Sequence, residues 1–322
     1  MAEWVYEESF GEKRALLIEN DQVLAARMHW LSSITAGAII MARVITRRQG
    51  SPRGLCRSPD GFEINVSDLP PEASEGRDVR IIIHREPMAE RGRLKRAQGR
   101  HFHENAPPLP PASVLGEGKV VRKLPDGLWE DVWAVASEGE LAFDGGSLVL
   151  SVTPAMTLID IDGQGSPREL ALSAIPAIAK ALRWLNIGGS IGVDFPTIAD
   201  KAGRKEVDQA LAAALADWRH ERTAMNGFGF VQIVSRMEMP SLLHRLENSR
   251  AEACARYLLR QASQLEGAGN IHISCNPAVR NAMPDDWLIE LGELAGRNPD
   301  AIMFETNRTL ALDAGHAQLV AA

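Results

Sequence analysis

The chain has 322 residues, of which 45% are hydrophobic, and a formal net charge of −7 at pH 7. This length and composition predict a globular protein of two or three domains. The chain contains no run of about eighteen apolar residues and no basic, then apolar, amino terminus, so neither a membrane span nor a signal peptide is expected. The cytoplasm is the default compartment. The three cysteines are too widely separated for a disulfide framework or a CxxC zinc site: Cys56, Cys254 and Cys275.

The stretch from His84 to His103 is basic although the whole chain is acidic. It contains only two acids, Glu86 and Glu90, and its cations are Arg85, Arg91, Arg93, Lys95, Arg96 and Arg100. Affinity for a phosphate backbone comes mainly from lysine and arginine, so the stretch predicts a surface that follows a nucleic-acid strand. The alternative is a solvated run of charge before a linker. A proline-rich segment, ENAPPLPPAS, follows His103 and predicts an extended linker.

Two apolar, β-branched runs, MTLIDIDGQ from Met156 and GGSIGVDFPTI from Gly188, each contain an aspartate near their end. Between them, Ser166-Pro167-Arg168-Glu169 fits a capping box that opens an amphipathic helix, and Pro176 is expected to kink or split this helix. A strand, a helix and a second strand in this order normally leave the two strands parallel. The pattern therefore predicts that Asp160 and Asp194 meet at one sheet edge, with Asp162 on the same face as Asp160.

Carboxylates gathered at one edge repel each other unless a cation lies between them. Mg²⁺ typically binds one or two carboxylates together with waters and substrate phosphates. The pair Asp160 and Asp194 therefore predicts a magnesium site suited to phosphodiester chemistry. The alternative is that both aspartates are polar residues where strands enter loops. After the second aspartate, the stretch from Lys201 to Thr223 is expected to form an exposed helix.

The order GGSLVLSVTPAMTLIDID, LRWLNIGGSIGVDF, GRKEVDQAL and FGFVQIVSRMEMPSL resembles the catalytic core of the ribonuclease E/G family. The resemblance implies a Mg²⁺-dependent endoribonuclease acting on single-stranded RNA. Asp160 and Asp194 match the family's two Mg²⁺-binding aspartates, whereas Asp162 stands where the family has an asparagine. Three residues of the predicted exposed helix fall near basic family positions close to the scissile phosphate: Arg204, Lys205 and Arg222.

The same resemblance implies that an OB-type barrel of RNA-binding kind is inserted after the first strands, with strands in AGAIIMARVITRR, GFEINVSDLP and DVRIIIHRE. Related barrels carry a phenylalanine at the positions of Cys56 and Glu63, and Phe62 lies one residue away. Phe62 is therefore either a base-stacking residue or part of the barrel core. Two family modules are missing. The long insertion that senses the RNA 5′ end is replaced by the short segment from His101 to Gly118, and the cysteine pair of the zinc link is absent near Cys254.

The predicted fold is α/β, with a catalytic α/β sheet, an inserted OB-type β-barrel and a small carboxyl-terminal α/β domain. The expected function is Mg²⁺-dependent cleavage of single-stranded RNA in RNA processing or decay, with Asp160, Asp162 and Asp194 as catalytic residues. The alternatives are a non-catalytic RNA-binding protein on the same scaffold and a metal-dependent phosphohydrolase acting on nucleotides. An oligomer is compatible with the sequence, but not through a zinc link. The expected divisions are 1–35 for the first strands, 36–100 for the barrel, 101–118 for the linker, 119–245 for the nuclease domain and 246–322 for the tail.

Overall fold

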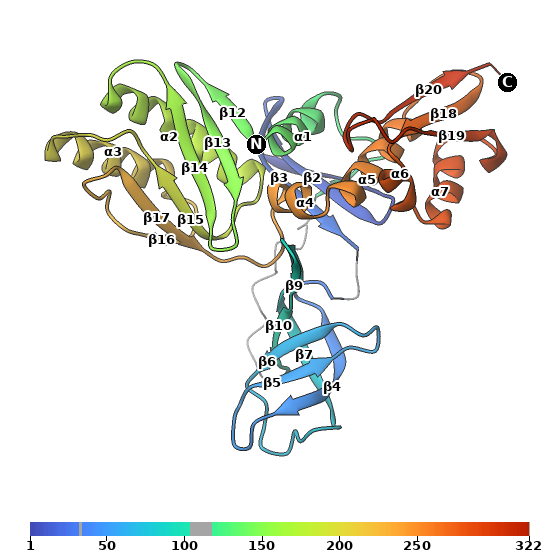
Figure 1. The fold of residues 1–322 in the computed structure, drawn as a ribbon, viewed down its shortest axis with the longest axis horizontal. Coiled ribbons are helices and arrows are strands. Elements are labelled where there is room, and N and C mark those ends of the chain that lie inside the picture. The colour runs from blue at the N-terminus through green and yellow to red at the C-terminus, as the bar shows by residue number, and fades with distance from the viewer. Residues whose placement is uncertain (32–33, 104–117, 322) are drawn as a thin grey trace.

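The computed structural model describes residues 1–31, 34–103 and 118–321. Figure 1 shows a central region around β1, β2 and β3, from which a large sheet with two helices extends to one side, a smaller α/β unit to the other, and a barrel below. The chain is therefore α/β, as predicted. Most of the predicted proline-rich linker, residues 104–117, lies outside the described residues.

The first sheet follows the order β11-β1-β2-β3. Three of its strands form an antiparallel meander at the start of the chain, and the fourth pairs with β1 in parallel after the barrel. Its strands are β1 (Glu3–Ser9), β2 (Glu12–Glu19), β3 (Gln22–Trp30) and β11 (Lys119–Val120). The barrel is thus an insertion between strands of one sheet.

The barrel is closed, with its strands in the order β10-β6-β5-β4-β7. It has its own apolar core, which includes Val44, Ile64 and Ile81. This confirms the predicted inserted barrel, in which β5 and β10 add to the three predicted strands. Its strands are β4 (Ile39–Arg47), β5 (Gly54–Arg57), β6 (Glu63–Ser67), β7 (Asp78–Arg85) and β10 (Ala97–His101).

One buried carboxylate anchors the barrel to the rest of the molecule. Glu86, which follows β7, is 5% exposed, and its side chain contacts His29 of β3 at 2.9 Å and Arg245 at 3.4 Å. Its backbone amide also donates to the carbonyl of Glu238 at 2.8 Å. Next to this anchor the basic stretch folds back as a short hairpin of β8 (Met88–Glu90) and β9 (Arg93–Lys95).

The large sheet follows the order β12-β13-β14-β15-β17-β16, and within it only β14 and β15 are parallel neighbours. The helix α2 (Pro167–Trp184) connects these two strands, so the predicted strand, helix and strand are confirmed. As the capping box predicts, the Ser166 hydroxyl accepts from the Glu169 amide at 3.3 Å. The helix continues through Pro176 without splitting. The strands are β12 (Glu140–Phe143), β13 (Gly146–Val152), β14 (Thr157–Gly163), β15 (Gly189–Asp194), β16 (His220–Arg222) and β17 (Phe230–Ser235).

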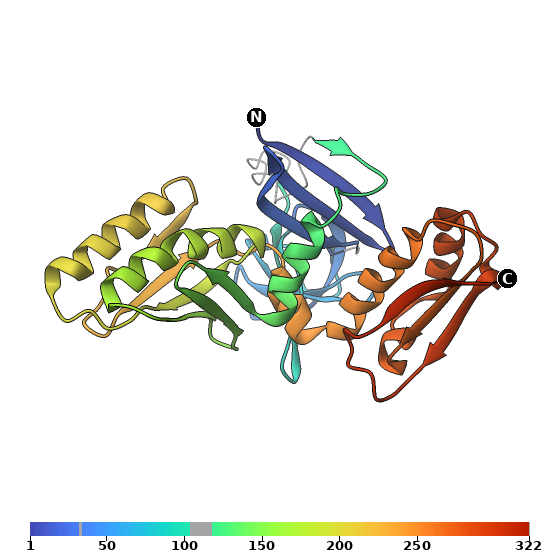
Figure 2. The same ribbon diagram turned by 90° about the horizontal axis from the view of Figure 1, so that it is seen from above.

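The helix layer covers one face of this sheet and leaves the other open. Figure 2 shows α2 and α3 (Lys201–Ala214) side by side above the strands. Ile159 and Val193 are fully buried toward the helices, whereas Val149 and Val234 on the opposite face are 38% and 49% exposed. In the described ranges, no helix is long and apolar enough to cross a membrane.

The carboxyl-terminal unit is a small sheet in the order β19-β18-β20 with helices packed against it. The predicted α/β tail is therefore present. The elements of this unit are α5 (Arg250–Ser263), β18 (Asn270–Cys275), α6 (Pro277–Asn281), α7 (Asp285–Ala295), β19 (Ile302–Thr306) and β20 (His316–Val320). Two further helices, α1 (Leu128–Glu138) and α4 (Leu242–Asn248), pack against each other, and α1 also packs against β3.

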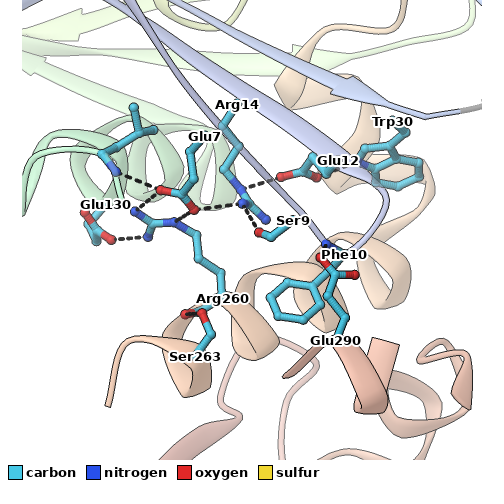
Figure 3. Close-up of polar contacts among 11 residues, drawn as sticks. Glu7, Ser9, Phe10, Glu12, Arg14, Trp30, Glu130, Arg260, Ser263 and Glu290 are labelled. Carbon is cyan, nitrogen blue, oxygen red and sulfur yellow. Dashed lines mark hydrogen bonds and ion pairs between the residues drawn. The ribbon is translucent and has the colours of Figure 1, made fainter. Parts of the chain in front are cut away.

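A buried ionic network connects α5 to the first sheet (Figure 3). The Glu7 carboxylate of β1 accepts from Arg14 of β2 at 3.0 Å and from Arg260 of α5 at 2.8 Å. Arg14 also pairs with Glu12, and Arg260 pairs with Glu130 of α1. The side chains of Glu7, Arg14 and Arg260 are at most 3% exposed, so this network holds three elements together out of contact with water.

Candidate active site

Asp160 and Asp194 lie opposite each other on the parallel strands β14 and β15, as Cα partners in the strand register. Neighbouring strands lie about 4.8 Å apart, and side chains alternate between the two faces of a sheet. Each aspartate follows a residue that is buried toward the helices, Ile159 or Val193, so both carboxylates lie on the open face. Both are exposed. The predicted convergence of the two residues is confirmed.

Neither of these carboxylates has a cationic partner among the described residues. The only hydrogen bond to the side chain of Asp160 comes from the amide of Ile161 at 3.0 Å, within the described part of the chain. Two unpaired carboxylates on adjacent strands repel each other, and a divalent cation between them would relieve the repulsion. Because Mg²⁺ uses few protein ligands and keeps waters and substrate phosphates, two carboxylates beside open solvent fit it.

Asp162 lies on the same face as Asp160, nearer the carboxyl end of β14, where its cross-strand neighbour is Ser147 of β13. It is exposed. Among the residues described, no three acidic, histidine or cysteine side chains are grouped closely enough to hold a metal ion. The structure therefore brings together Asp160 and Asp194 but does not add Asp162 as a third ligand beside them.

A hydrophobic surface borders the two aspartates on the open face. Phe230 of β17 is the cross-strand partner of Asp194, and its ring extends over Gly192. A Cβ atom at Gly192 would lie 2.6 Å from the Phe230 ring and 2.9 Å from the Met156 sulfur, so only glycine leaves room for both side chains. Sequence reasoning missed this contact because Phe230 and Gly192 are joined only by the pairing of β15 with β17.

The predicted helix over residues 201–223 is wrong beyond its first part. The helix α3 ends at Ala214, and His220–Arg222 forms β16, which pairs with β17. Hydrogen bonds to β17, the next strand along the chain, decide this segment, and its helical periodicity does not reveal them. The edge strand is short, as exposed sheet edges often are.

The three basic residues predicted near the scissile phosphate lie around α3 in different settings. Arg204 donates to the carbonyls of Ile198 and Ala199 at 2.7 and 2.8 Å, so it holds the loop after β15. Arg222 pairs with Asp208. Lys205 is exposed and forms no ion pair with a described residue, which leaves its charge available to a ligand.

Much of the charge in the basic stretch is neutralised within the protein. Arg93 and Lys95 both pair with Glu90, at 2.6 and 3.2 Å, and Arg96 pairs with Glu63 at 2.6 Å. Arg91 is exposed and has no such partner in the described ranges. The stretch is therefore not the uniform cationic surface that its composition predicts.

The remaining arginines of the stretch, Arg85 and Arg100, lie on the barrel strands β7 and β10 and are partly buried. Arg85 donates to the carbonyl of Arg96 at 3.0 Å. The pKa of His84 is lowered, first by burial and then by the positive charges of Arg236, Arg85 and Arg100. The charges of these three arginines therefore act on His84 despite the neighbouring ion pairs.

His84 lines a groove of about 660 Å³ on the outside of the barrel. Arg48, Arg53, Asn65 and Gln98 line the same groove, so it offers two guanidinium groups and two amides to a ligand. Phe62 does not line it and is partly buried against the barrel core. This placement agrees with the core alternative for Phe62. Sequence reasoning missed the groove because its walls come from five strand regions that only barrel closure brings together.

All three cysteines are free and buried. Burial raises the pKa of Cys56 and of Cys254 to about 11. A cysteine must be a thiolate to bind zinc. We therefore predict that elemental analysis of the purified protein finds no stoichiometric zinc, and that native thiols react slowly at neutral pH but all react after denaturation. Stoichiometric zinc, or an oligomer that dissociates when a zinc chelator is added, would contradict this prediction.

Comparison with known proteins agrees with this geometry. Residues 134–237 match the sequence model of the Ribonuclease E/G family, and this segment includes Asp160, Asp194 and Phe230. Ribonuclease G of Escherichia coli strain K12 is 34% identical over 116 residues, covering 32% of this chain and 24% of that protein. Ribonuclease G of Haemophilus influenzae is 33% identical over 135 residues, covering 36% and 27%.

A chloroplastic Ribonuclease E/G-like protein of Arabidopsis thaliana is 29% identical over 126 residues, covering 35% of this chain and 13% of that protein. The chain thus matches about a quarter or less of the length of these curated relatives. The matched part is the strand, helix and strand unit that carries the two aspartates, together with β17. Through this segment the chain is similar to the Ribonuclease E/G family.

Proposed function

We propose that this protein is a Mg²⁺-dependent endoribonuclease that cleaves single-stranded RNA on the open face of its large sheet. The observation that carries the proposal is the pairing of Asp160 with Asp194 in register, without cationic partners among the described residues, inside the segment that matches the family. Asp160 and Asp194 would hold the ion. When bound, Mg²⁺ polarises a phosphoryl oxygen and lowers the pKa of the attacking water.

The barrel groove supports the RNA-binding part of the proposal. Arg48 and Arg53 would contact phosphates there, and Arg85 and Arg100 place further positive charge near His84. On the helix layer, Lys205 of α3 provides a further cation that has no ion pair in the described ranges. The net charge of −7 does not attract RNA to the chain as a whole. Binding would therefore depend on local regions of positive charge. The proposed role of the protein is RNA processing or decay.

The experiment that tests this function incubates the purified protein with a labelled single-stranded RNA in Mg²⁺ or in a chelator. Internal cleavage that requires Mg²⁺ is expected, with RNA binding that weakens as salt concentration rises. Salt-sensitive binding without cleavage would support the non-catalytic RNA-binding alternative. Hydrolysis of nucleotides without RNA binding would support the phosphohydrolase alternative. Either result would contradict the proposed activity.

We further predict that cleavage is indifferent to the chemistry of the RNA 5′ end. The family's sensing insertion is replaced by a short segment that is largely outside the described residues, and the arginine before the family's phenylalanine–glycine pair is Gly227 here. Gly227 is exposed, and a Cβ atom there would contact nothing within 4 Å. Rates on identical RNAs with 5′-monophosphate, 5′-triphosphate or 5′-hydroxyl ends should agree. A preference for monophosphate of about tenfold, or about 1.4 kcal/mol, would show that a sensor remains.

A further inference from the structure

Phe228 is the most exposed aromatic side chain next to the candidate active site. It is 82% exposed, whereas the other seven phenylalanines, all in the described part of the chain, are buried or partly buried. A large apolar ring gains free energy by leaving water, so a fully solvated phenylalanine contributes nothing to the stability of this fold. The ring is therefore available for contact with a ligand at the candidate active site.

The turn that carries Phe228 holds the residue outward. The Asn226 side-chain oxygen accepts from the amides of Phe228 and Phe230 at 2.9 and 3.1 Å, and the Gly229 amide donates to the Asn226 carbonyl at 3.2 Å. Gly229 has φ +93°, and a Cβ atom there would lie 2.3 Å from the carbonyl oxygen of Phe195. The turn therefore packs against Phe195, the residue that follows β15. Its hydrogen bonds fix the backbone that carries the Phe228 ring.

The position of this turn relates Phe228 to the two aspartates. Phe230 is the cross-strand partner of Asp194, and Phe228 precedes it by two residues, just beyond the carboxyl end of β15. Asp162, two residues past Asp160 on β14, lies beyond the Asp160–Asp194 pair in the same direction.

We propose that Phe228 stacks against a nucleobase next to the scissile phosphate and so positions the RNA strand over Asp160 and Asp194. This inference rests on the proposed function. Every base offers an aromatic face, so such a contact would favour unpaired RNA without selecting a sequence. It would also supply, beside the catalytic aspartates, the stacking aromatic that Phe62 does not offer in the barrel groove.

The test compares Phe228→Ala, Phe228→Leu and Phe228→Trp with the wild-type protein, using Val234→Ala as the control. Val234 is 49% exposed on β17, the strand that follows the Phe228 turn, and lies near the far end of that strand. Two quantities are measured: RNA affinity in a chelator, and KM and kcat in Mg²⁺. The alanine and leucine variants should bind RNA on the order of tenfold more weakly, because a stacked base is lost, whereas tryptophan should retain affinity. The control should match the wild type.

A second arm places single abasic sites along the RNA around the cleavage position. In the wild type, one abasic position should reduce affinity by about the same factor as Phe228→Ala, and the two changes should not add, since they remove the same contact. Full additivity at every position, or equal affinity of Phe228→Ala and Val234→Ala, would overturn the inference while leaving the proposed function standing.

Two other outcomes separate the inference from the function it rests on. A wild-type protein that neither binds nor cleaves single-stranded RNA would refute the proposed function, and the stacking role with it. A wild-type protein that binds without cleaving leaves the affinity measurements to decide the role of Phe228. A change in sedimentation of Phe228→Ala would show instead that the ring packs between copies of the chain, and would overturn the inference.

Discussion

Replacing Asp160 or Asp194 by asparagine is expected to reduce Mg²⁺-dependent RNA cleavage by about a thousandfold. A metal-held phosphoryl oxygen accounts for several kcal/mol of transition-state stabilisation, and about 1.4 kcal/mol corresponds to a factor of ten in rate. Asparagine keeps the size of the side chain but removes the charge that binds the ion. Single-turnover cleavage of a labelled RNA at several Mg²⁺ concentrations measures the loss.

These substitutions should leave the fold intact. Both carboxylates are exposed and lack ion pairs with described residues, so removing one charge relieves repulsion and does not orphan a partner. The unfolding midpoint should therefore be unchanged or slightly higher. A lower midpoint that accounts for the lost activity would show that these aspartates are structural.

Asp162→Asn is the matched control for these two variants. Asp162 lies on the same strand and face as Asp160 but joins no metal-binding group among the described residues, and asparagine is the residue usual in the family. Retained or increased activity is expected. Complete loss would show that Asp162 is itself an essential ligand, and undiminished cleavage by both Asp160→Asn and Asp194→Asn would refute the metal site.

Replacing Glu7 by alanine is expected to cost about 3–5 kcal/mol of unfolding free energy, because two buried guanidinium groups lose the carboxylate that they share and keep only one ion-pair partner each. Arg14 and Arg260 share the Glu7 carboxylate, and the side chain of each is 1% exposed. Their guanidinium groups cannot lose a proton to escape this penalty. Urea unfolding followed by circular dichroism measures the change as a lower midpoint, and Glu7→Gln should lose less because it keeps a hydrogen-bond acceptor.

The neighbouring residue provides the control. Glu8 pairs with Lys13 at 2.9 Å, but these side chains are 50% and 39% exposed. An exposed pair contributes only about 0–1 kcal/mol, so Glu8→Ala should unfold almost as the wild type does. Equal losses for Glu7→Ala and Glu8→Ala would show that the network in Figure 3 does not hold α5 to the first sheet.

Local patterns predicted the unit that carries the aspartates. Alternating β-branched residues, the Ser166 capping box and the helical repeat that follows depend on nearest neighbours along the chain, and the structure contains all three. The parallel pairing of Asp160 with Asp194 follows from the short connection by one helix. Their role as Mg²⁺ ligands remains a prediction.

Local sequence patterns did not predict the contacts between segments that lie far apart in the chain. Composition predicted a cationic stretch, but the pairing of Arg96 with Glu63, which lies 33 residues earlier, neutralises part of it. At shorter range, pairing with the next strand, β17, makes His220–Arg222 a strand where a helix was predicted. The Glu7 network is also absent from any local pattern, since its partners lie up to 253 residues apart.

The sequence by itself determined which segments become strands and helices around the aspartates, because steric preference and hydrophobic periodicity act within a few residues. Only the tertiary structure decided which charges remain free, which face of the sheet stays open, and that Phe228 stands in solvent beside that face. These properties depend on what lies across from each residue after folding. The energies of burial and of strand or charge pairing arise from contacts between segments. Local patterns along the chain do not predict which residues make these contacts.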